Sequence, residues 1–180
     1  MDKKRLHKRT IELSSFDLGH EKVLVEGTLV DRRFVPIYDV GEEVREEGVV
    51  HHMKIRLVVK GIPPEILDVE AEMEAYPHPE CPKTLDTLEQ IKGMKLRGGF
   101  SEKVRTIMGG TKGCVHLTHL LIAMAQEIFA GSMTNRLRKP RPRPKELSEI
   151  EGLEYLVNSC RVWRKDGPLF TRLKETVGPD

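Results

Sequence analysis

The sequence predicts an α+β protein in which helices cover one face of an antiparallel sheet. Apolar and polar residues alternate over 49–60 and again over 67–75, as expected of strands with one buried face. The turn residues Gly61 to Pro64 separate the two stretches, so we expect them to be hairpin neighbours. Apolar residues then recur at helical spacing over 114–129.

Two earlier strands are expected at Thr10 to Leu13 and at Val23 to Leu29, separated by a turn over Ser14 to Gly19. They begin an antiparallel meander. The polar segment 34–48 has no apolar periodicity and predicts an exposed connection.

The alternation over 49–60 places His51 on the buried face of the sheet. Lys54 and Arg56 lie on the opposite face, where we expect them to approach the glutamates of the next strand. The apolar set of the first stretch is Met53, Ile55, Leu57 and Val59, and that of the second is Leu67, Val69, Ala71, Met73 and Ala75.

Three helices are expected after the sheet. Pro82 suits the first turn of a helix that Gly93 ends, with Leu85, Leu88 and Ile91 on its inner side. Ser101 is a suitable N-cap for a short helix that ends at Met108. The glycine-rich turn 109–113 then leads into the long helix.

The chain is expected to divide into an α+β core over 1–133, a basic proline-rich linker over 134–145 and a C-terminal extension over 146–180 that packs back on the core. Apolar residues from Leu147 to Val157 predict a helix in the extension. Asp166-Gly167 predicts a tight turn between short extended pieces, hence a hairpin.

Composition limits the classes of function. Charged residues make up 32% of the 180 residues, but the net charge is only +2, which disfavours nucleic acid as a partner and leaves a protein partner or a homo-oligomer open. No apolar run is long enough to span a bilayer or to serve as a signal peptide, so we expect a cytoplasmic protein with no membrane segment. In that setting the three cysteines are expected to be reduced thiols or metal ligands.

Four residues are candidate metal ligands: His51, Cys81, Cys114 and His116. Both cysteines fall where a helix begins, and unpaired N–H groups there favour metal binding or nucleophilic chemistry by a thiolate. Thiolates with imidazoles suit zinc or an iron–sulfur cluster. The alternative is that each is an inert packed residue, and the sequence has no C-x-x-C pair to decide the matter. Three roles are open for Cys160: a fourth metal ligand, a resolving thiol in disulfide exchange, or a small buried residue.

Four blocks of the sequence resemble the signature blocks of a bacterial family, the domain-of-unknown-function 2889 family. The resemblance extends from about Arg9 to Phe170 and implies no particular reaction. His52 stands where the family usually has an aspartate, so no role of that carboxylate carries over to this chain. The blocks are His51-His52-Met53, Pro77-His78-Pro79-Glu80-Cys81, Gly113-Cys114-Val115-His116-Leu117, and Asn158-Ser159-Cys160-Arg161 with Asp166-Gly167-Pro168.

The chain is more distantly similar to the SufE/NifU (IscU-like) iron–sulfur scaffold and sulfur-acceptor proteins, in which a short meander precedes helices. The similarity implies a zinc or cluster site. His51 stands at the aspartate position of their first motif, Cys81 at the second site and Cys114 at the third, whereas Val49 replaces their first cysteine.

Three functions stay open. The preferred one is a metal-binding scaffold, sulfur acceptor or structural module. The second is a zinc- or cysteine-dependent enzyme acting on a small carbonyl or aromatic metabolite, in which His116 activates Cys114 or zinc keeps an open position. The third is a binding module whose segment from Arg136 to Lys145 contacts an acidic partner.

Overall fold

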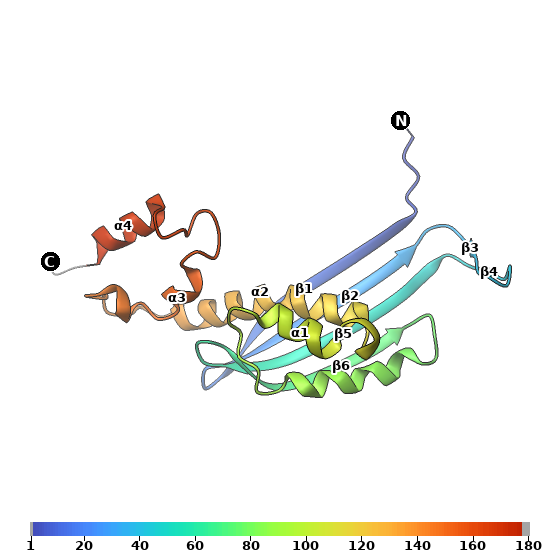
Figure 1. Cartoon of the computed structure of the whole chain (residues 1–180), viewed down its shortest axis with the longest axis horizontal. Helices are drawn as coiled ribbons and strands as arrows, with labels where there is room; N and C mark the ends of the chain where they lie inside the picture. The colour runs from blue at the N-terminus through green and yellow to red at the C-terminus, as the bar shows by residue number, and fades with distance from the viewer. Residues whose placement is uncertain (1, 178–180) are drawn as a thin grey trace.

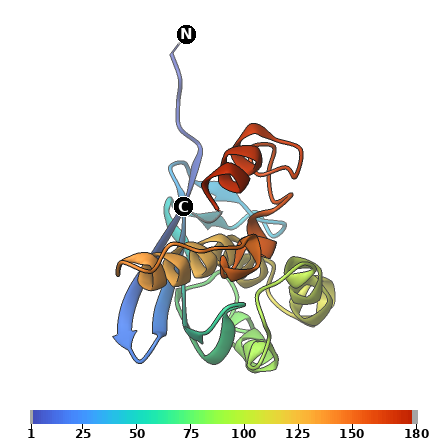
Figure 2. The same ribbon diagram turned by 90° about the vertical axis from the view of Figure 1, so that its left-hand side faces the viewer.

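A computed structural model describes residues 2–177 and confirms the α+β architecture. A four-stranded antiparallel sheet has the strand order β1-β2-β5-β6, and helices η1, α1 and α2 lie on one of its faces (Figures 1 and 2). The strands are β1 (His7–Gly19), β2 (Lys22–Arg33), β5 (Gly48–Lys60) and β6 (Glu65–Ala75). The helices are η1 (Cys81–Ile91), which is of the 3-10 type, α1 (Phe100–Met108), the short η2 (Gly110–Lys112) and α2 (Val115–Leu137).

The alternation in the sequence sets which face of the sheet is buried. The predicted apolar residues of β5, from Met53 to Val59, are each at most 1% exposed, and Val23, Val25 and Leu29 of β2 pack beside them. On the other face Arg56 contacts Glu26 and Glu72, as the predicted cross-strand pairing required. The helices therefore pack only on the apolar face.

The prediction for β6 is wrong at one position. Leu67 is 41% exposed, whereas Ile66 and Val69 are buried. The register shifts between Val58 and Val59, which pair with Asp68 and Ile66, so Leu67 is an extra residue on β6. Such a bulge changes the phase of the alternation, and Leu67 points away from the core.

The turn predicted over Ser14 to Gly19 is also wrong, because this segment continues β1. The chain reverses instead at His20 and Glu21, whose φ angles are +50° and +62°. The segment 34–48 is exposed, as predicted, and contains a small ribbon of β3 (Ile37–Tyr38) and β4 (Val44–Arg45).

Small residues let α2 approach the sheet closely. A Cβ atom on Gly27 of β2 would lie 2.6 Å from the Met124 sulfur, and one on Gly131 of α2 would lie 2.4 Å from the Ser15 hydroxyl. Ser15 also donates a hydrogen bond to Glu127 at 2.7 Å. These contacts fix how α2 crosses β1 and β2.

The C-terminal segment differs from its prediction. Helix α2 continues to Leu137, so Arg136 lies in the helix and not in the linker. The predicted helix over Leu147 to Val157 is reduced to η3 (Leu147–Glu149) and α3 (Leu153–Leu156). The predicted hairpin is wrong as well, because Pro168 begins helix α4 (Pro168–Thr176), for which its fixed φ is suited.

The ring of Tyr155 meets that of Phe129 of α2 at a centroid distance of 6.4 Å. Helix α3 thereby contacts the core, while the following segment extends past the end of the sheet (Figure 1). Within residues 2–177, none of the helices combines the length and the apolar character that crossing a membrane requires.

Candidate metal centre

Three side chains stand side by side in neighbouring strands at one end of the sheet. Arg9 of β1 pairs directly with Asp31 of β2, and Asp31 pairs directly with His51 of β5. Directly opposed residues place their side chains on the same face of a sheet. For this row it is the face that the helices cover, since Leu29 and Met53, two residues away, are buried.

Asp31 is a buried carboxylate at the centre of this row, with only 1% of its surface exposed. Arg9 donates two hydrogen bonds to it, from Nε to Oδ1 and from a terminal nitrogen to Oδ2, each 2.7 Å long. The His51 Nδ1 atom lies 3.1 Å from Oδ2. A buried charge requires such partners, and the bidentate guanidinium is a strong one.

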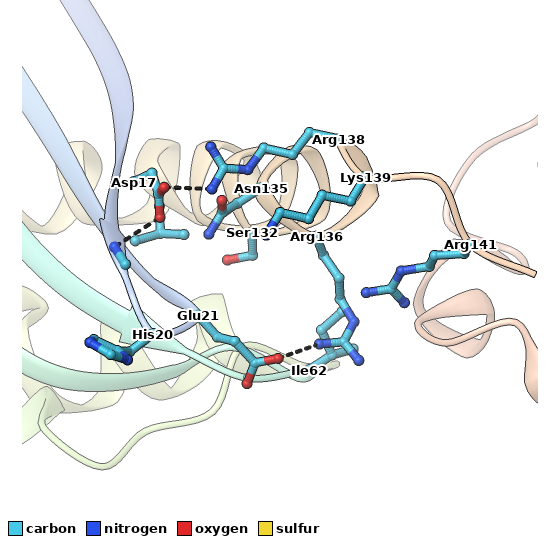
Figure 3. A pocket seen from close by; sticks show the side chains of 13 residues that line it. Asp17, His20, Glu21, Ile62, Ser132, Asn135, Arg136, Arg138, Lys139 and Arg141 are labelled. Carbon is cyan, nitrogen blue, oxygen red and sulfur yellow. Dashed lines mark hydrogen bonds and ion pairs between the residues drawn. The ribbon is translucent and has the colours of Figure 1, made fainter.

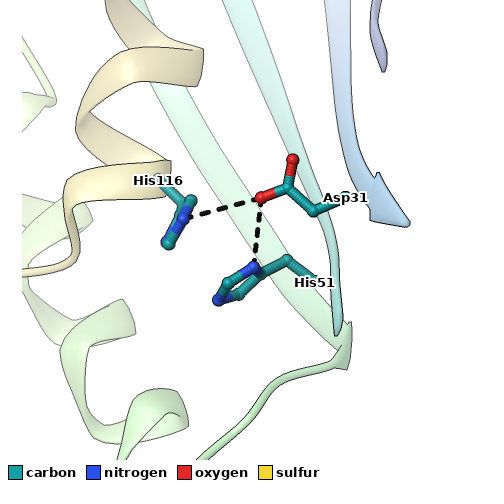
Figure 4. A group of neighbouring side chains, drawn as sticks. All are labelled: Asp31, His51 and His116. Carbon is teal, nitrogen blue, oxygen red and sulfur yellow. Dashed lines mark hydrogen bonds and ion pairs between the residues drawn. The ribbon is translucent and has the colours of Figure 1, made fainter. Parts of the chain in front are cut away.

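His116 approaches the row from the first turn of α2, on the helical side (Figure 4). Its Nε2 atom lies 3.6 Å from Asp31 Oδ2, which is too long for a direct hydrogen bond. Its ring lies over that of His51 with the centroids 3.8 Å apart. On its other side, Nδ1 lies 3.9 Å from the Cys114 sulfur.

The electrostatics keep Asp31 charged and the two imidazoles neutral. Burial tends to raise the pKa of Asp31, but the hydrogen bonds and charge of Arg9 outweigh it, and the pKa lies below its ordinary value. Burial lowers the pKa of His51 in spite of the Asp31 charge. Burial, with the neighbouring His51 and Arg9, lowers the pKa of His116 to about 4. Both rings therefore have a lone pair available at neutral pH.

The position of His116 depends on how α2 begins. The Thr118 hydroxyl lies 3.0 Å from the carbonyl oxygen of Met108, at the end of α1, and 2.8 Å from that of Cys114. At Gly113 a Cβ atom would lie 2.8 Å from the Met108 carbonyl oxygen, so only glycine fits there without a backbone shift. This explains why a glycine-rich turn precedes the histidine.

The structure brings His51 and His116 together and places Cys114 beside His116. Among residues 2–177, the one group of three metal-ligating side chains with donor atoms within 4.8 Å of one another is Asp31, His51 and His116. Cys81 lies outside this group. It is the first residue of η1, which begins at the same end of the sheet as α2 (Figure 1). Cys160 is an exposed free thiol in the C-terminal segment.

Sequence reasoning missed Asp31 and its partner Arg9. A signal was present, since Asp31 continues the inward-facing positions 23, 25, 27 and 29 of β2. A carboxylate at a position whose neighbours are all apolar needs a partner on the same face. The register that brings Arg9, Asp31 and His51 into one row supplies that partner.

Comparison with known proteins gives one match. The model of the family described as "Protein of unknown function (DUF2889)" matches residues 7–130. No curated protein and no solved structure matches the chain, so the similarity to SufE and NifU proteins has no support from a relative. The matched range contains the whole sheet, η1, α1 and most of α2, including Asp31, His51 and His116. The chain therefore belongs to this DUF2889 family.

Proposed function

We propose that the protein binds a single divalent transition-metal ion through Asp31, His51 and His116. One observation carries the proposal: a buried carboxylate and two neutral imidazoles, from β2, β5 and α2, have donor atoms within 4.8 Å of one another. Neutral imidazole and ionised carboxylate are the forms that coordinate metals, and the pKa shifts favour both of them at neutral pH.

The distances suit an ion that sits between the three side chains. Bonds from zinc to nitrogen or oxygen are about 2.0 to 2.2 Å long, so donors around one ion are separated by roughly 3 to 4 Å. The Asp31 Oδ2 atom is 3.1 Å from His51 Nδ1 and 3.6 Å from His116 Nε2. The three donor atoms all lie within 4.8 Å of one another, so an ion between them requires side-chain rotations that bring the donors to its bonding distance.

Arg9 is compatible with this role of Asp31. A carboxylate has about four lone-pair sites, and Arg9 uses one on each oxygen. The histidines face the Oδ2 atom, which keeps a further lone pair. Ligating carboxylates commonly receive such a second hydrogen bond, which fixes their orientation.

The donor set favours zinc or iron(II) over an iron–sulfur cluster. Clusters are held by several thiolates, whereas Cys114 is the one cysteine in contact with this group among the described residues. Two histidines and one carboxylate leave coordination positions open. The Cys114 sulfur lies 3.9 Å from His116 Nδ1, on the side of the ring away from Asp31, so it does not belong to this set of ligands. A scaffold or sulfur-acceptor role would use the same open positions.

Metal content tests this proposal. Protein purified without chelator should contain about one zinc or iron per chain by elemental analysis, and the apoprotein should bind Co²⁺ with visible absorption bands. His51→Gln and His116→Gln should each weaken Co²⁺ binding by about tenfold or more. Substituting a residue that only hydrogen-bonds to a metal ligand already lowers metal affinity by that factor. The spectrum should show no thiolate-to-cobalt band, because the Cys114 sulfur lies at the other nitrogen of the His116 ring.

His52→Gln is the matched control. His52 adjoins His51 but faces the other side of the sheet, where it contacts Glu74 at 2.8 Å. This variant should bind Co²⁺ as the unmodified protein does. Folded apoprotein that binds no stoichiometric ion, or equal losses in the His51 and His52 variants, would rule out the site.

A second candidate function is a cysteine-dependent enzyme, and the order of contacts favours it. Cys114 Sγ faces His116 Nδ1 at 3.9 Å, and His116 Nε2 faces Asp31 Oδ2 at 3.6 Å. A nucleophile, a base and an orienting carboxylate are arranged in this sequence in thiol-dependent hydrolases. His116 is neutral at pH 7, so its Nδ1 lone pair can accept the thiol proton, although the lowered pKa makes this imidazole a weaker base than a free histidine.

Alkylation rates distinguish the two functions. In metal-free protein, iodoacetamide should modify Cys114 faster than Cys81, and His116→Gln should slow the reaction at Cys114 alone, by about tenfold or more, because positioned general bases contribute at least that much. Peptide mass spectrometry measures both thiols in one sample, so Cys81 is an internal control. If the rate at Cys114 does not depend on His116, the nucleophile hypothesis fails while the metal proposal is unaffected.

A further inference from the structure

A pocket of about 390 Å³ lies at the other end of α2 from the candidate metal centre (Figure 3). The β1–β2 turn forms one wall with His20 and Glu21, and the β5–β6 turn contributes Ile62. The last turn of α2 and the chain that follows supply Ser132 and the basic side chains. His116 and Arg136 are 20 residues apart on one helix, so the two sites are separated by about 30 Å.

Basic side chains dominate the wall of this pocket. Arg136, Arg138, Lys139 and Arg141 line it, against two carboxylates, Asp17 and Glu21. The end of α2 carries the negative end of the helix dipole, so any attraction for an anion must come from these side chains. The pocket is large enough for a small metabolite.

The arginines are held in place around the pocket by weak ion pairs. Arg138 contacts Asp17, and Arg136 contacts both Glu151 and Glu21, the latter at 3.3 Å. Arg141 contacts Glu151 at 3.3 Å. Exposed pairs of this kind contribute little to stability, and each guanidinium keeps further N–H donors that can face the pocket. Lys139 makes no ion pair with any part of the chain that the structure describes.

Ser132 gives an independent indication of a ligand. The residue is only 8% exposed, and its hydroxyl is buried without a hydrogen-bond partner among the described residues. Figure 3 shows this hydroxyl directed into the pocket, between the β1–β2 turn and the arginines. A buried hydroxyl that bonds to nothing is costly, so a polar group in the pocket is expected to pair with it.

We propose that this pocket binds the phosphate group of a small phosphorylated molecule. Lys139 and the free N–H groups of Arg138 bind the phosphate oxygens, and the Ser132 hydroxyl donates a further hydrogen bond. Guanidinium and ammonium groups around a hydroxyl form a typical phosphate site. Val23 and Ile62, also in the wall, offer apolar contact to the organic part of the ligand.

A small ligand fits better than a nucleic acid. The basic groups surround a concave site and the orphan hydroxyl is buried at its base, whereas nucleic acid binding requires an extended basic surface with aromatic side chains for the bases. The lining residues include no phenylalanine, tyrosine or tryptophan.

Calorimetric titration with inorganic phosphate, pyrophosphate and glycerol 3-phosphate tests the proposal on the full chain. We expect the protein to bind glycerol 3-phosphate or pyrophosphate more tightly than it binds chloride at the same ionic strength. Lys139→Gln should weaken binding by about tenfold, as expected for one charge-assisted hydrogen bond, and Ser132→Ala by about three- to tenfold. Lys145→Gln is the control, because Lys145 lies in the same basic segment but outside the pocket.

Three results would overturn the proposal. The first is that none of the three phosphates binds. The second is that Lys145→Gln weakens binding as much as Lys139→Gln does, and the third is that Ser132→Ala leaves the affinity unchanged. A single-stranded oligonucleotide that binds in preference to the small phosphates, with a steep salt dependence, would also overturn it and identify the segment as a nucleic-acid surface. Metal content and this titration are independent, so the failure of one leaves the other proposal standing.

Discussion

Asp31→Asn should lower the free energy of unfolding by about 2 to 4 kcal/mol, measured by urea denaturation of the metal-free protein. The carboxylate is 1% exposed and accepts two hydrogen bonds from Arg9. An asparagine presents an NH₂ group to one of these donors, so one hydrogen bond is lost and the charge that makes the other strong is removed. Chelator is present throughout, so that loss of bound metal does not contribute.

Glu26→Gln is the matched control. Glu26 lies on the same strand and accepts a hydrogen bond from Arg56 of the neighbouring strand, but on the solvent-exposed face. Its loss should cost at most about 1 kcal/mol, because exposed ion pairs are weak. Equal effects of the two substitutions would show that burial does not strengthen the Arg9–Asp31 pair.

The second large effect is a loss of stability in mild acid that depends on His116. The pKa of His116 falls from the ordinary 6.5 to about 4 on folding. Between these values the unfolded chain binds more protons, so the stabilisation is complete above pH 6.5 and is lost as the pH falls towards 4. For this one side chain, which is 20% exposed, the loss between pH 7 and pH 5 is about 2 kcal/mol.

Urea denaturation of the metal-free protein at several pH values from 7 to 5 measures this slope. His116→Gln should reduce it, whereas His119→Gln, at an exposed position on the same helix, should retain it. His51, whose pKa is also lowered, adds to the slope in the same direction and is present in every variant. A His116→Gln protein that loses stability as steeply as the unmodified chain would contradict the assignment.

The sequence was sufficient to predict the four strands and the helices that cover them, because each has a regular pattern of burial, but not the extent of β1 or the bulge at Leu67. Residues 53 to 59 alternate as required by a strand with one wet face, and Leu88 and Ile91 are buried as their spacing predicts. The C-terminal segment was predicted less well. It has few buried residues, Leu153 and Phe170 among them, so no strong periodicity determines its structure.

The candidate site was only half predictable. His51 was placed on the inner face by the alternation, and His116 was placed at the start of a helix by the glycine-rich turn. Asp31 and Arg9 were missed because their contact with each other and with His51 depends on the strand register, which the sequence pattern does not determine. The sequence predicts Cys81 as a ligand from its place at a helix start and from the resemblance to scaffold proteins, whereas the structure groups a carboxylate with the two imidazoles.

The candidate ligands come from positions 31, 51 and 116, which are separated along the chain by the β2–β5 connection, the β5–β6 turn and helices η1, α1 and η2. No fragment that lacks either the first hairpin or the long helix brings these donors together. If the proposed site holds an ion, binding and folding should favour each other, and proteolysis should degrade the metal-free protein faster than the metal-bound protein.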